Sequence, residues 1–128
     1  IYALQAGPLV HMQHLQHALQ NVPPRVLIRT REHLALDRFD PALTALAPDT
    51  VHALSLLGVQ LIGIDSASID PADSKTLPSH QQMREHGVRV LENLWLDAVP
   101  EGDYELIALP LKLMTADASP VRAVLREL

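Results

Sequence analysis

The run Val59–Ile64 constrains the fold of this chain more than any other feature. It is almost wholly aliphatic and is bounded by Gly58 on one side and Asp65 on the other. A short apolar run that ends at turn-forming residues is typical of a strand buried inside a sheet. The position of Asp65 directly after this strand is where α/β proteins often place binding loops, although turn formation is the more common role for Asp65 and for Asp70 in the same loop.

A helix is predicted immediately before that strand, over residues 49–57. Val51, Leu54 and Leu57 recur at intervals of three residues and would face a core, which leaves His52 on the surface. Asp49 is the predicted N-cap, and Gly58 would end the helix. A helix that leads into a buried strand is typical of an α/β layer architecture.

The whole chain is predicted to form one α/β domain with a mixed central sheet and flanking helices. Its 128 residues are 48% hydrophobic, which is enough for one conventional core. Aromatic residues make up 3% of the sequence, so this core must be aliphatic. The predicted sheet strands cover residues 25–29, 59–64, 104–113 and 121–125, and the predicted helices cover residues 10–20, 49–57 and 80–86.

A second helix and its end organise the region that follows. Ser79 and Gln82 have the spacing of a capping box, which predicts a helix that begins at His80. Gly87 is the predicted end, because glycine readily adopts the left-handed conformation found after helices. Val88 and Val90 then alternate with a polar residue, as in a strand.

This helix end allows His80 and Glu92 to approach each other. In one continuous helix they would lie about 18 Å apart. A short helix followed by a returning strand predicts instead that both side chains point into one cavity, close enough to bind ions that touch each other. Histidine and carboxylate are common zinc ligands. Without other information, this spacing is weak evidence for a metal site, since His80 as a surface residue and Glu92 as half of an ion pair are the more common roles.

Three histidines near the start of the chain are a weaker candidate for metal binding. His11, His14 and His17 lie on the helix predicted over residues 10–20. At about 100° per residue they spread over a solvent-facing arc and do not converge on one point.

Several segments together resemble the bacterial kynurenine formamidases of the metal-dependent cyclase-like hydrolase family. The resemblance is continuous from about residue 23 to residue 128 and weaker before it. It is carried by Asp65–Asp73 (DSASIDPAD), by His80 with Glu92 twelve residues later, and by the closing runs GDYELIALPLKL (102–113) and DASPVRAV (117–124).

The resemblance implies a swivelling β/β/α cyclase-like fold and a specific reaction. The enzymes of this family hydrolyse N-formyl-L-kynurenine to L-kynurenine and formate in tryptophan catabolism, by means of metal-activated water. The positions of His80 and Glu92 match metal ligands, and two zinc ions per complete site are expected. Asp65 and His86 are candidates for the substrate pocket or for supporting the ligands. Gln81 departs from the family, in which a second histidine often follows the ligand.

The resemblance also implies that these residues are the C-terminal portion of a longer domain. The family's motif His-x-Gly-Thr-His-x-Asp-x-Pro-x-His is absent from the sequence. We therefore expect the N-terminal part of the domain, with the catalytic residues and further ligands, to be missing from these 128 residues. A homodimer in the cytoplasm is expected, with a small molecule as its substrate.

Composition argues against other classes of partner. The net charge of −5 gives no basic surface for nucleic acid or anionic membranes, and no apolar run is long enough to span a bilayer. Without cysteine, neither disulfides nor thiolate metal sites are available. Two alternatives remain open: a related hydrolase or cyclase that acts on another amide or cyclic amide, and an inactive fragment or interaction module.

Overall fold

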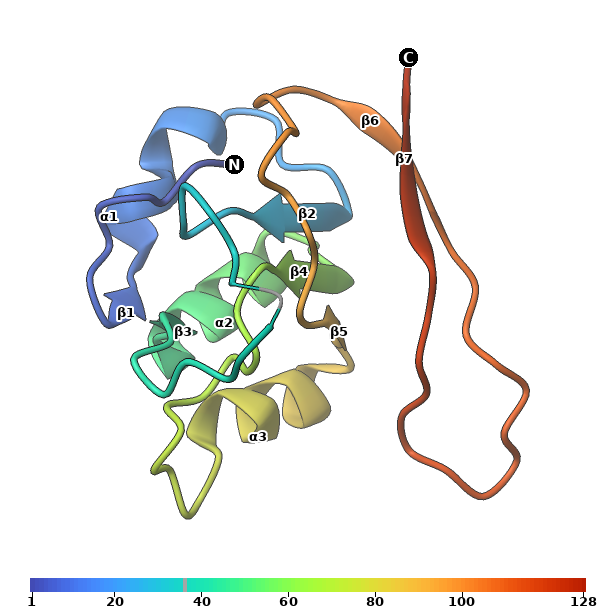
Figure 1. The fold of residues 1–128 in the computed structure, drawn as a ribbon. Coiled ribbons are helices and arrows are strands. Elements are labelled where there is room, and N and C mark those ends of the chain that lie inside the picture. Colours follow the sequence, from blue (N-terminus) through green and yellow to red (C-terminus); the bar gives the residue numbers. More distant parts are fainter. Residues whose placement is uncertain (36) are drawn as a thin grey trace.

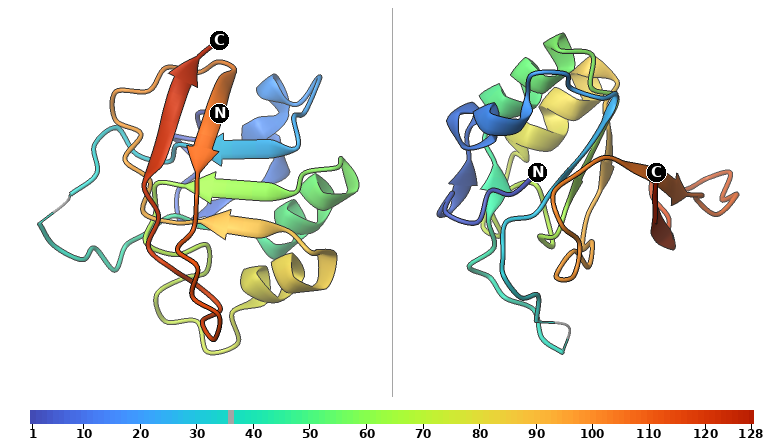
Figure 2. Two further views of the ribbon diagram at one scale, coloured as in Figure 1. Left: turned by 90° about the vertical axis from the view of Figure 1, so that its right-hand side faces the viewer. Right: turned by 90° about the horizontal axis from the view of Figure 1, so that it is seen from above.

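A three-stranded parallel sheet forms the centre of the computed structural model, which describes residues 1–35 and 37–128. The sheet has the order β2-β4-β5, with β2 at Arg25–Ile28, β4 at Leu61–Ile64 and β5 at Arg89–Leu91. Figure 2 shows the three arrows side by side with their carboxyl ends at one edge. The loops that follow these strands therefore leave from the same edge.

Alternate residues of the sheet build an aliphatic core with two helices. Val26, Ile28, Ile62 and Ile64 are 0–2% exposed. They belong to one buried cluster with side chains of α2 (Pro48–Leu56) and α3 (Pro78–His86), namely Val51, Leu54 and Met83. Both helices lie on the same side of the sheet (Figure 1). Full burial of each such side chain contributes about 1.5–3 kcal/mol, so this cluster stabilises the body of the domain.

Close packing at Gly63 marks the opposite face of the sheet. A Cβ atom at Gly63 would lie 2.4 Å from Leu27 Cδ2 and 2.6 Å from Leu94 Cδ1. Leu94 is 8% exposed and comes shortly after β5. Glycine at position 63 thus lets the segment after β5 pack directly onto β4.

The N-terminal segment covers one edge of the domain with short elements. They comprise β1 (Leu9–Val10), α1 (Met12–Leu15), the 3₁₀ helix η1 (Gln16–Ala18) and β3 (Ala45–Leu46), and β1 pairs with β3 in parallel. Ahead of them, Tyr2 bridges to Arg29 next to β2. The helix predicted over residues 10–20 is therefore much shorter, because the last turn tightens into η1.

The last two strands form a ribbon apart from the central sheet. Strand β6 (Tyr104–Ala108) pairs with β7 (Ala123–Glu127) in antiparallel fashion. The ribbon lies on the side of the sheet opposite α2 and α3 and runs across the parallel strands (Figures 1 and 2). The prediction that these strands join the central sheet is wrong, and so is the extension of the first of them to residue 113, since β6 ends ahead of Pro110.

The α/β architecture is confirmed, and the remaining differences concern the ends of elements. Helix α2 begins at Pro48 with Ala47 as its N-cap, so the prediction of Asp49 as the cap is wrong. Leu57 follows the last helical residue and is 50% exposed, so the prediction that it faces the core is also wrong. Proline suits the first helical position because the N–H it lacks would be unpaired there. Within the described residues, none of the helices is long and apolar enough to cross a membrane.

Candidate metal centre

His80 and Glu92 meet at the carboxyl edge of the central sheet. Glu92 comes directly after β5, and His80 lies in the first turn of α3. The His80 Nε2 atom is 3.4 Å from Glu92 Oε1, and the two side chains are 35% and 27% exposed. The predicted approach of the two side chains is confirmed. It depends on Gly87, which ends α3 with φ = 68° and allows the chain to return through β5.

Asp70 holds the other side of the His80 ring. Its carboxylate oxygen Oδ2 is 2.7 Å from His80 Nδ1 and also accepts a hydrogen bond from the His80 backbone N–H at 3.0 Å. Oδ1 accepts the backbone N–H of Ser79 at 2.9 Å. The Asp70 side chain is 0% exposed. One buried carboxylate therefore fixes both the main chain and the ring of His80.

Asp70 also explains why the predicted capping box is wrong. Helix α3 begins at Pro78, one residue before Ser79, and its N-cap is Leu77 in a left-handed conformation with φ = 51°. The Ser79 hydroxyl donates instead to the Leu46 carbonyl at 2.7 Å. Leucine has no side-chain acceptor, so the first N–H groups of the helix are paired by Asp70 from the preceding loop.

Glu92 is anchored by the same loop and by the end of β4. Its Oε1 atom accepts the backbone N–H of Ile69 at 2.9 Å. The next residue, Asn93, has φ = 57° and donates its N–H to the Ser66 carbonyl at 2.9 Å. Asparagine tolerates this left-handed conformation better than most residues. The loop after β4 thus fixes Glu92 on one side and His80 on the other.

Asp65 lies at the same carboxyl edge of the central sheet but binds the segment that follows β2. Its side chain accepts hydrogen bonds from the Thr30 hydroxyl at 2.7 Å, the Thr30 N–H at 2.9 Å and the Arg31 N–H at 3.1 Å. The Arg31 side chain donates a hydrogen bond to the Asp40 carboxylate, and this hydrogen bond lowers the pKa of the Asp40 carboxyl. The structure thus places Asp65 as a buried link between the ends of β4 and β2.

His86 lies away from His80 and Glu92. Six residues separate it from His80 on α3, which corresponds to about 9 Å along the axis and about 240° around it. Its Nε2 atom is 2.9 Å from Nδ1 of His52 on α2, and both residues are exposed. His52 was predicted to lie on the surface, and this is confirmed. The structure does not bring His86 to the candidate centre.

The metal-binding groups of the candidate centre are few. In residues 1–35 and 37–128, no three or more His, Cys, Asp or Glu side chains form a group that could hold a metal ion.

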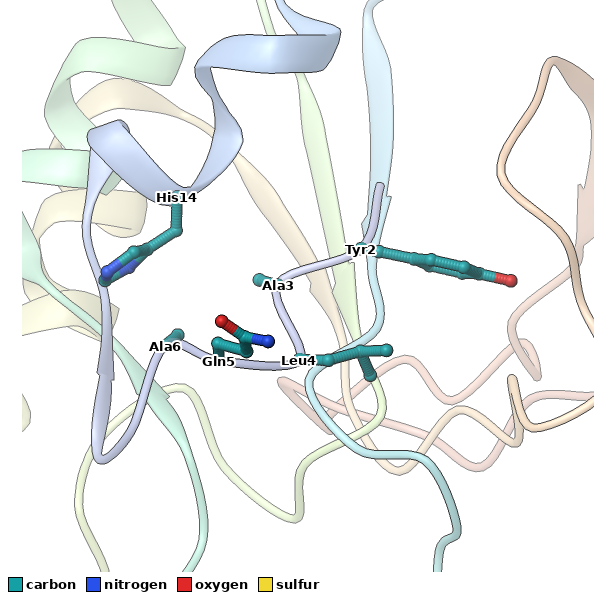
Figure 3. A pocket seen from close by; sticks show the side chains of 6 residues that line it. All are labelled: Tyr2, Ala3, Leu4, Gln5, Ala6 and His14. Carbon is teal, nitrogen blue, oxygen red and sulfur yellow. The ribbon is translucent and has the colours of Figure 1, made fainter.

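A cavity of about 300 Å³ lies at the N-terminal segment, lined by Tyr2, Ala3, Leu4, Gln5, Ala6 and His14. Figure 3 shows that the Tyr2 ring points away from His14 there. His80 and Glu92 do not line it, and that they share a cavity stays a prediction.

Asp70 is the residue of this centre that the sequence pattern did not single out. Turn formation is the usual role of an aspartate followed by proline in a long loop, and that was the prediction for it. A usable signal lies in Leu77 and Pro78, because a helix that starts there has no capping side chain of its own. Such a helix needs an acceptor from elsewhere in the chain.

The fold is that of the cyclase-like metal-dependent hydrolases. A solved structure described as a potential metal-dependent hydrolase with cyclase activity matches with a TM-score of 0.87 and 28% identity, over 100% of this chain and 64% of that one. A predicted metal-dependent hydrolase from Bacillus stearothermophilus matches with a TM-score of 0.86 over 98% of this chain and 60% of that one, also at 28% identity. No protein-family model matches the sequence.

Curated relatives narrow the resemblance to one group of enzymes. The chain is 66% identical to a kynurenine formamidase of Paracidovorax citrulli over 98% of its length, and 61% identical to those of Polaromonas naphthalenivorans and Bordetella pertussis over 100%. It is thus homologous to the kynurenine formamidases along essentially its whole length. It spans 60%, 56% and 61% of the lengths of these three relatives.

Proposed function

We propose that His80 and Glu92 are ligands of a divalent metal centre. The observation that carries this proposal is the 3.4 Å separation of His80 Nε2 and Glu92 Oε1, together with the contact of His80 Nδ1 to a buried carboxylate. Imidazole nitrogen and carboxylate oxygen suit zinc and similar ions. A histidine whose second ring nitrogen bonds a carboxylate is the usual arrangement around zinc.

We further propose that two zinc ions occupy the complete centre and that the other ligands lie outside these 128 residues. A catalytic zinc takes three protein ligands, more than His80 and Glu92 supply. The incomplete coverage of the relatives supports the same view. The 128 residues alone should bind zinc weakly and show no turnover. Turnover of about 1 per second or more would contradict this, because that rate is ordinary for a complete enzyme.

The reaction that we propose for the complete protein is hydrolysis of N-formyl-L-kynurenine to L-kynurenine and formate. Its support is the identity of 61–66% to kynurenine formamidases. A bound zinc ion supplies Lewis acidity, which polarises a carbonyl oxygen. The residues of this chain would hold that ion: Asp70 orients His80, the loop after β4 anchors Glu92, and Leu94 packs the segment after Glu92 onto the sheet.

A related reaction is the second candidate, because one structural neighbour is described with cyclase activity. We expect kcat/KM for N-formyl-L-kynurenine to exceed that for other linear and cyclic amides. Turnover of a cyclic amide with N-formyl-L-kynurenine left intact would favour the second candidate. Absence of both zinc binding and turnover would favour the remaining alternative, an inactive fragment or interaction module.

We also propose that the protein is a homodimer in the cytoplasm, as the resemblance implies. The ribbon and its connecting loop support association, since they expose a series of large apolar side chains: Ile107, Leu109, Leu111, Leu113, Met114 and Val124. Analytical ultracentrifugation should give twice the monomer mass, and a monomer at micromolar concentration would contradict the proposal. Cell fractionation tests the location.

A further inference from the structure

We propose that Asp70 is a positioning residue that fixes the tautomer and orientation of His80, so that Nε2 is the nitrogen available to the metal ion. Asp70 Oδ2 contacts both the Nδ1 atom and the backbone N–H of His80, at 2.7 and 3.0 Å. Because Asp70 Oδ2 contacts both the main chain and the ring of His80, the imidazole ring cannot rotate without losing its contact to Asp70.

The chemistry of the two side chains determines which nitrogen is free. A carboxylate only accepts hydrogen bonds, and a neutral imidazole has one N–H and one bare nitrogen. Both ring nitrogens face a carboxylate, but the contact of Nδ1 to Asp70 is the shorter, at 2.7 Å against 3.4 Å from Nε2 to Glu92. In the neutral ring this places the hydrogen on Nδ1 and leaves the lone pair on Nε2. That nitrogen is the one that faces Glu92, at 3.4 Å.

Burial makes this contact stronger and more specific than an exposed one. The Asp70 side chain is 0% exposed, and its other oxygen is used by the Ser79 N–H. The carboxylate is also at the positive end of a nine-residue helix, which favours a negative group there. The same residue thus has a structural role, as the cap of α3, and a positioning role toward His80.

This inference rests on the proposed metal-binding role of His80, and the two can fail separately. Zinc titration of the complete protein should show that Asp70→Ala weakens binding by about 10- to 100-fold, as for other partners of metal-bound histidines. Asp70→Asn keeps one acceptor oxygen and should fall between the alanine variant and the wild type. The matched control is Ser79→Ala, which removes the buried bond to Leu46 but leaves the ring contact. Its zinc affinity should change by less than about twofold, because it touches no metal-binding atom.

The second measurement is independent of metal loading, and its wild-type result does not depend on the folding of any variant. Nitrogen-15 NMR of the metal-free wild type should show the His80 hydrogen on Nδ1. In folded Asp70→Ala, the hydrogen should move toward Nε2. A wild-type ring with its hydrogen on Nε2 would overturn the inference, as would a folded Asp70→Ala protein with unchanged zinc affinity. If His80→Ala itself leaves zinc affinity unchanged, the proposed metal role of His80 fails instead.

Discussion

The two ends of helix α3 carry the same kind of residue in opposite surroundings. At the N-terminal end, His80 lies between two carboxylates, Asp70 at 2.7 Å and Glu92 at 3.4 Å. At the C-terminal end, His86 faces another imidazole, that of His52, and is exposed to solvent. The helix is common to both, so the difference comes from the segments that reach each end.

This difference shows that the loops, and not the helix, decide which histidine can support metal chemistry. The loop after β4 brings Asp70 to one face of the His80 ring and the Ile69 N–H to Glu92. Only α2 reaches His86 with a polar partner among the described contacts. Two imidazole rings in an exposed contact lack the anionic ligand that a zinc centre of this type uses.

The largest expected effect is the loss of activity at the N-terminal end. In the complete protein, His80→Ala and Glu92→Ala should each lower kcat/KM by more than about 100-fold, more than loss of a residue that only supports a ligand. Glu92→Ala should cost more if its carboxylate bridges two ions, since two like charges would then lose the anion between them. His86→Ala is the matched control on the same helix. An equal loss of kcat/KM in His86→Ala would contradict the different roles assigned to the two ends of α3.

A smaller effect is expected where the helix ends. Gly87 has φ = 68°, and a Cβ there would meet no heavy atom within 4 Å. Gly87→Ala should therefore lower the free energy of unfolding by about 1 kcal/mol through backbone strain alone. Gly102→Ala is the control, because its Cβ would make an ordinary contact at 3.7 Å with the Tyr104 ring. Urea denaturation measures both, and equal midpoints would show that Gly87 is not needed to end α3.

The smallest effect is expected for the pair of histidines at the C-terminal end. His52→Ala and His86→Ala should each change the free energy of unfolding by about 0.5 kcal/mol or less, the low end for a hydrogen bond, because the pair is exposed. A double-mutant cycle isolates the coupling between the two rings. Coupling above about 1 kcal/mol would show that this contact matters more to α2 and α3 than its exposure suggests.

The elements that could be predicted from the sequence are those set by local patterns. The run Val59–Ile64 contains β4 because an aliphatic segment between turn residues has no other stable place in a domain of this size. Gly87 ends α3 because its left-handed conformation is a local requirement. The predicted approach of His80 and Glu92 follows from the second feature, the helix end at Gly87, and from the strand pattern after it.

The features that could not be predicted depend on contacts between distant residues. Asp70 caps α3 from nine residues before Ser79, and no local spacing encodes that contact. The Ser79–Gln82 pattern is misleading because the helix starts at Pro78, two residues before the predicted start at His80. The ribbon of β6 and β7 was placed in the central sheet because strand pattern indicates a strand but not its neighbour.

The location of bound zinc tests the central claim most directly. Crystals of the complete protein grown with zinc should show an anomalous peak bonded to His80 Nε2 at about 2.0–2.1 Å and to a Glu92 carboxylate oxygen at about 2.0–2.2 Å. Asp70 should remain on Nδ1 and outside bonding distance of the ion. A peak on His80 Nδ1, or zinc at His52 and His86 with none at His80, would contradict the account.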